Sequence, residues 1–156
     1  MRLEVPCFRQ ERPYTCVPAC LRMVLAYLGD EDAEPELAAL CGTSRIGTSE
    51  SGVIRALEFL DCDYDYLQRA DLDAVTAWLA EGRPLIVFLR VDQLTIGASG
   101  RHAVVVCGIE SSGSSEELGV VVLNPASGAT EVLPGDAFLR AWRQQGSEAV
   151  VVLAAR

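Results

Sequence analysis

The stretch from Gln10 to Gly29 constrains the fold more than any other part of the chain, because it joins a cysteine to the start of a helix pattern. After Cys16, apolar residues recur at helical spacing, and the pattern stops at Gly29, a residue type that commonly ends helices. Thr15 is a suitable N-cap, and Pro18 falls in the first turn, where its missing N–H costs little. The sequence therefore places Cys16 at the positive end of a helix dipole, which favours the thiolate form.

Three further residues have side chains suited to thiol chemistry. Gln10 lies six residues before Cys16, His102 opens the apolar run His-Ala-Val-Val-Val-Cys, and Asn124 ends the run Val-Val-Val-Leu. A cysteine nucleophile needs a base, a group that orients the base, and donors for an oxyanion. His102 is the only histidine, and imidazole is the side chain whose ordinary pKa lies near ~6.5. The chain thus offers one candidate for each role.

The order Gln10, Cys16, His102, Asn124 resembles that of the papain-like cysteine peptidases, and within them the C39-like branch of bacteriocin-leader peptidases. The resemblance spans nearly the whole chain, from Val5-Pro-Cys-Phe-Arg-Gln10 to the closing strand. It implies that Cys16 is the nucleophile, His102 the acid and base, Asn124 the orienting group and Gln10 an oxyanion donor. It also implies a peptide or protein substrate cut after small residues, often a Gly-Gly pair, with no cofactor.

Two residues depart from the pattern of that family. Val17 stands where glycine usually follows the nucleophile, and Asn124 stands where aspartate would offset the imidazolium charge. They motivate an alternative, a catalytically silent domain that binds a leader or tail peptide. Asp92 is a reserve candidate for orienting His102, and amide transfer would use the same residues as hydrolysis. Cys16 and Cys20 share a helix face, but with no Cys-x-x-Cys pair and one histidine we expect no metal.

The expected elements place helices first and antiparallel strands mostly second, which is an α+β arrangement. We expect helices over residues 16–28, 34–41, about 49–60, 71–81 and 135–143. We expect strands over residues 62–67, 85–89, 102–109, 119–123, 131–133 and 149–153, of which 85–89 is apolar throughout and should be buried on both faces. The resemblance implies a papain-like layout over a single domain, residues 1–156, with the cysteine in an N-terminal helical half and the histidine and asparagine in a C-terminal antiparallel sheet.

Composition narrows the expected partners and compartment. The net charge of −9 argues against nucleic acid and anionic membranes as main partners, and all 13 basic residues are arginine. No apolar run approaches the ~20 residues needed to cross a bilayer. The N-terminus lacks the charged and apolar regions of a signal peptide, so we expect a cytoplasmic protein whose six cysteines are free thiols. The sequence does not predict an oligomeric state.

Overall fold

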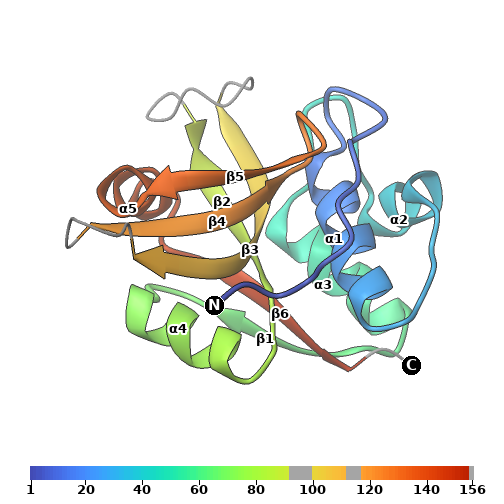
Figure 1. The fold of residues 1–156 in the computed structure, drawn as a ribbon. Helices are drawn as coiled ribbons and strands as arrows, with labels where there is room; N and C mark the ends of the chain where they lie inside the picture. The colour runs from blue at the N-terminus through green and yellow to red at the C-terminus, as the bar shows by residue number, and fades with distance from the viewer. Residues whose placement is uncertain (92–99, 112–116, 155–156) are drawn as a thin grey trace.

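The computed structural model describes residues 1–91, 100–111 and 117–154, which form an α+β fold (Figure 1). Its helices are α1 (Cys16–Tyr27), α2 (Glu34–Cys41), α3 (Glu50–Phe59), α4 (Leu72–Ala80) and α5 (Gly135–Arg143). Its strands are β1 (Asp63–Leu67), β2 (Leu85–Arg90), β3 (Arg101–Ser111), β4 (Leu118–Asn124), β5 (Ala129–Pro134) and β6 (Ala149–Ala154). The predicted fold class is confirmed, and each expected element lies within two residues of its expected bounds.

Local sequence signals explain where several helices begin and end. Ser49 caps α3 by accepting a hydrogen bond from the Gly52 N–H, and Asp71 caps α4 by accepting one from the Ala74 N–H. Gly42 ends α2 in the left-handed region, with φ of 65°, where a side chain would be strained. These punctuation residues make the helix boundaries readable from sequence.

The sheet has the strand order β1-β6-β2-β3-β4-β5, and every neighbouring pair is antiparallel. The last strand of the chain, β6, therefore lies between β1 and β2. Because β3 and β4 are antiparallel neighbours, the start of β3 at Arg101 and the end of β4 at Asn124 lie at the same end of these paired strands. The start of β5 at Ala129 lies there too, since Ala129 is paired with Asn124.

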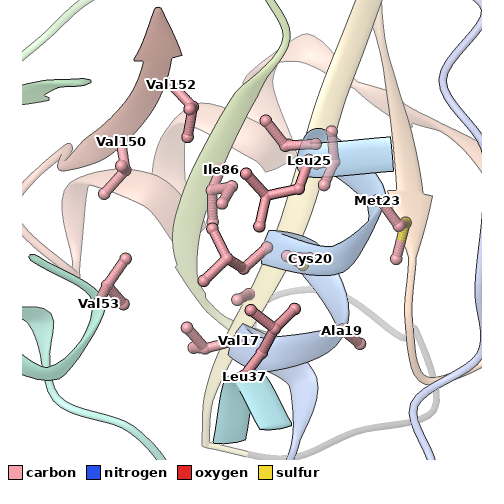
Figure 2. Packing of buried hydrophobic residues seen from close by; sticks show 14 of the residues in the cluster. Val17, Ala19, Cys20, Met23, Leu25, Leu37, Val53, Ile86, Val150 and Val152 are labelled. Carbon is pink, nitrogen blue, oxygen red and sulfur yellow. The ribbon is translucent and has the colours of Figure 1, made fainter. Parts of the chain in front are cut away.

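Helices cover both faces of this sheet, and alternate strand residues belong to separate apolar clusters. On β3, Val105 packs with α1, α2 and α3, whereas Val104 packs with α4 and α5. Figure 2 shows part of the first cluster, in which α1 residues lie beside Ile86 of β2, and Val150 of β6 belongs to the same cluster. The residues of 85–89 are all buried, as predicted for a strand covered on both faces. Packing on this side holds α1, and with it Cys16, against the sheet.

The six cysteines all lie in the described part of the chain and form no disulfide. None of the helices in the described part of the chain combines the length and apolar character needed to span a bilayer.

Candidate active site

Cys16 is the first residue of α1, and the segment before it is fixed by a buried carboxylate. The Glu34 carboxylate accepts a hydrogen bond from the Thr15 hydroxyl at 2.9 Å and another from the Glu11 N–H at 2.7 Å. The Arg12 N–H donates to Thr15 Oγ1 at 3.0 Å. Thr15 occupies the predicted N-cap position, but its side chain accepts from Arg12 instead of capping α1. The first turn of α1 therefore has no side-chain cap from Thr15.

His102 lies at the start of β3 and is held by Asn124 at the end of β4. The His102 Nε2 atom and the Asn124 Oδ1 atom are 2.9 Å apart, and both residues are buried. Asn124 Nδ2 donates to Glu131 Oε2 of β5 at 2.6 Å, and Asn124 Oδ1 also accepts from the Ala126 N–H at 3.0 Å. Three neighbouring strands thus contribute His102, Asn124 and Glu131 to one connected group.

These contacts determine which imidazole nitrogen carries the proton of the neutral ring. A carboxylate accepts only, so the Asn124 nitrogen must face Glu131, and the Ala126 N–H donates only, so the Asn124 oxygen must face Ala126. His102 Nε2 therefore meets an acceptor and must carry the proton of the neutral ring. The unprotonated Nδ1 atom is left to accept a proton from a thiol.

Gln10 reaches the same region through the turn that follows β4. Its backbone N–H donates to the Pro125 carbonyl at 2.8 Å. Its side-chain Nε2 donates to the Arg12 carbonyl at 2.7 Å, which uses one of the two amide hydrogens. The predicted oxyanion donor therefore has one N–H engaged and one remaining.

A cleft of about 570 Å³ joins three of the four predicted site residues. Gln10, Cys16 and His102 all line it, whereas Asn124 lies buried beside His102. Val17 is buried in the apolar cluster around α1 and is not part of the cleft lining, so its β-branched side chain does not narrow the approach to Cys16. The reserve candidate Asp92 lies outside the described residues. The remaining lining residues are Arg9, Glu11, Arg12, Pro13, Tyr14, Arg45, Ile46, Gly47, Arg101 and Ala126.

Burial controls the protonation of Cys16. It raises the pKa of the thiol above the ordinary value, and hydrogen bonds from the backbone of Ala103 and Val17 and the positive charge of Arg101 lower that pKa only in part. From the helix dipole alone, the sequence predicts a stabilised thiolate. That prediction is wrong for the free protein because desolvation is the largest influence on the pKa of the Cys16 thiol and raises it.

Burial also controls the protonation of His102. It lowers the imidazole pKa below its usual range, while the hydrogen bond to Asn124 and the negative charge of Glu131 raise it in part. Neutral thiol and neutral imidazole are therefore favoured together near neutral pH. Among the hydrogen bonds of the described residues, none joins the Cys16 thiol to the His102 ring.

Sequence reasoning missed two charged residues at this site. Glu131 is two residues from the buried Leu133 on β5, so the period of a strand places its carboxylate on the same side as a core residue. That signal was available in the sequence. Arg101, whose guanidinium forms an ion pair with Glu50 at 2.6 Å, immediately precedes His102 and carries no comparable signal.

Comparison with known proteins agrees with the resemblance drawn from sequence. The model of the Peptidase_C39 like family matches residues 2–150. Short matches of 49% and 48% identity, over 47 and 48 residues, link the chain to uncharacterized proteins of Methanothermobacter thermautotrophicus and Methanothermobacter marburgensis. The matched part spans about a third of the length of each of these relatives and about 30% of this chain.

Three solved structures share the fold of the chain. A Bacillus anthracis protein described as a C39-like peptidase superposes over 100% of both chains with a TM-score of 0.77 and 16% identity. The peptidase domain of Streptococcus ComA, a bi-functional ABC transporter involved in a quorum sensing pathway, superposes with a TM-score of 0.73 and 22% identity. The match covers 98% of this chain and 100% of that domain. A double glycine motif protease from an AMS/PCAT transporter, solved in complex with the leader peptide, superposes with a TM-score of 0.70 and 20% identity. The match covers 97% of this chain and 93% of that one.

Proposed function

The chain belongs to the Peptidase_C39 like family, and we propose that it is a cysteine peptidase that cuts a peptide or protein precursor after small residues such as a Gly-Gly pair. One observation carries the proposal. The contacts of Asn124 leave His102 Nδ1 as the base, and His102 shares its cleft with Cys16 at the start of α1. The leader peptide bound to the double glycine motif protease supports a peptide as the occupant of the corresponding cleft.

In the proposed reaction, His102 Nδ1 takes the proton of the Cys16 thiol as the sulfur attacks the scissile carbonyl carbon. A C–S bond forms, and the carbonyl becomes an oxyanion that the Cys16 N–H and the remaining Gln10 amide N–H stabilise. The imidazolium then protonates the leaving amine as the C–N bond breaks, which gives a thioester at Cys16. Water attacks the thioester with His102 again acting as base, and the acid product and the thiol are released.

The test is cleavage of a set of synthetic peptides with a central Gly-Gly pair, followed by mass spectrometry. We expect the unmodified protein to cut such peptides through a thioester on Cys16 that is trapped at low pH. Cys16→Ala should abolish cleavage, whereas Cys7→Ala, which changes a cysteine outside the cleft lining, should retain it. Cleavage that persists in Cys16→Ala at the rate of the unmodified protein would contradict the proposal.

A second candidate is a silent domain that binds a leader or tail peptide without cutting it. It is favoured by the burial that raises the pKa of the Cys16 thiol and lowers the pKa of His102, because both shifts oppose formation of a thiolate–imidazolium pair. Peptide affinity that is equal in the unmodified protein and in Cys16→Ala, without any turnover, would establish this candidate. Detection of a thioester at Cys16 would eliminate it.

A further inference from the structure

The cleft has a charge opposite in sign to that of the whole chain. Four of the 13 arginines line it, namely Arg9, Arg12, Arg45 and Arg101, whereas Glu11 is the one acidic residue of its lining within the described part of the chain. The lining therefore carries a formal charge of +3, from four arginines and one glutamate, in a chain whose net charge is −9. A cleft lined by one sign of charge concentrates ligands of the opposite sign.

Three of these arginines are available to a ligand. Arg9, Arg12 and Arg45 are exposed, and within the described residues no carboxylate forms an ion pair with any of them. Arg101 differs, because its guanidinium binds the Glu50 carboxylate and the Thr48 carbonyl. The cationic character of the cleft therefore comes mainly from guanidinium groups that form no ion pair with the described carboxylates.

The backbone that carries the three arginines is held in place. Arg9 packs on the turn after β4, where a Cβ at Gly128 would lie 2.8 Å from the Arg9 Cβ, so glycine permits the close approach. The backbone N–H and carbonyl of Arg12 are both engaged, by Thr15 Oγ1 and by the Gln10 side chain. Arg45 lies in a turn closed by reciprocal hydrogen bonds between the backbones of Ser44 and Gly47. Two separate segments thus present guanidinium groups to one cleft.

We propose that the cleft at Cys16 selects peptides with aspartate or glutamate side chains close to the segment that it binds. Guanidinium groups bind carboxylates through directed, charge-assisted hydrogen bonds, and neutral side chains of the same size cannot form them. The remaining surface of the chain repels acidic peptides, so the arginines also direct such peptides to the cleft. This inference rests on the proposed function only in that a peptide occupies the cleft.

The test measures binding to Cys16→Ala protein, so its outcome does not depend on cleavage. Two fluorescent peptides with a central Gly-Gly pair are compared by anisotropy, one with flanking glutamates and the other with glutamines, both amidated at the C-terminus. We expect the glutamate peptide to bind more tightly at low salt and to lose most of that advantage at ~1 M salt, where the Debye length is about 3 Å. Each exposed ion pair should contribute a factor of up to roughly five.

Matched arginine variants assign the preference to the cleft. In the Cys16→Ala background, Arg9→Gln with Arg45→Gln should reduce the preference for glutamate by roughly three- to tenfold. Arg140→Gln with Arg143→Gln, which removes two exposed arginines of α5 outside the cleft, should leave the preference unchanged. Both pairs change the net charge equally. Equal affinity for the two peptides, or an equal loss in both double variants, would overturn the proposal. So would tighter binding of a third peptide, the glutamine peptide with a free C-terminal carboxylate, than of the glutamate peptide.

Discussion

Glu131→Gln is the change that most directly tests how the charge beside Asn124 acts on His102. The Glu131 carboxylate accepts from Asn124 Nδ2 at 2.6 Å, and Asn124 Oδ1 lies 2.9 Å from His102 Nε2. Glutamine retains an acceptor oxygen for Asn124 but removes the negative charge, so the connected group can persist. Because Glu131 raises the pKa of His102, its removal should lower that pKa further.

The size of this effect follows from the spacing of the group. With one amide between them, carboxylate and imidazole lie on the order of 7 Å apart, where unit charges at an effective dielectric constant of ~20 interact by roughly 2 kcal/mol. Glu131 is partly exposed, and solvent screening leaves an interaction on the order of 1 kcal/mol. If cleavage occurs, the loss of imidazolium stabilisation should lower kcat/KM by about fivefold.

Proton NMR measures the pKa without ambiguity, because His102 is the only histidine in the chain. Its ring resonance should titrate below the ordinary midpoint in the unmodified protein and lower still in Glu131→Gln. Glu110→Gln is the matched control, since it removes a carboxylate that pairs with Arg2 near the other end of β3. An unchanged or raised midpoint in Glu131→Gln, or an equal shift in both variants, would refute the reasoning.

Three further predictions follow from the protonation states and from a helix cap. The rate of iodoacetamide alkylation of Cys16 should rise with pH, with a midpoint pH above that of an ordinary cysteine, because burial raises the pKa of the thiol. A midpoint pH below that of an ordinary cysteine would show that the helix dipole dominates. The free energy of unfolding should fall as the pH drops from ~6.5 towards the lower folded pKa of His102, because the unfolded chain takes up that proton first. In His102→Gln this part of the pH dependence should be missing. Identical pH dependence of the two proteins in urea titrations would argue against this prediction. Ser49→Ala should lower the free energy of unfolding by about 1 kcal/mol through loss of the hydrogen bond from the Gly52 N–H, and no loss in urea denaturation would exclude Ser49 as a stabilising cap.

Much of the fold could be predicted because helices and strands in this chain are bounded by strong local signals. Gly42 and Asp71 stop and start helices by local backbone and hydrogen-bond chemistry. The sheet order could not be predicted in the same way. The position of β6 between β1 and β2 depends on pairing between segments far apart in the chain, such as Val87 with Ala149, and strand patterning alone does not specify a partner.

The sequence predicts which residues form the candidate site but not their electrostatics. The order of the four predicted residues carried the family resemblance, yet nothing local to Cys16 reveals how much of its surface the fold buries. Glu131 reaches Asn124 because β4 and β5 pair in one particular register, in which Asn124 lies opposite Ala129. A register is a tertiary property, so the sequence indicates that Glu131 lies on the same side of β5 as a core residue but not that its carboxylate contacts Asn124.

The register also suggests why an amide can stand at position 124 where the family usually has aspartate. Asn124→Asp would put two carboxylates at the present 2.6 Å contact with Glu131, and like charges that close cannot both ionise, so one proton would be shared between them. In the double variant with Glu131→Gln, the new carboxylate would instead accept from the glutamine amide and face His102 fully charged. We therefore expect the His102 pKa to rise more in the double variant than in Asn124→Asp alone. The same NMR titration measures the His102 pKa in both variants. An equal rise of that pKa in both would mean that the residues at 124 and 131 act on His102 independently.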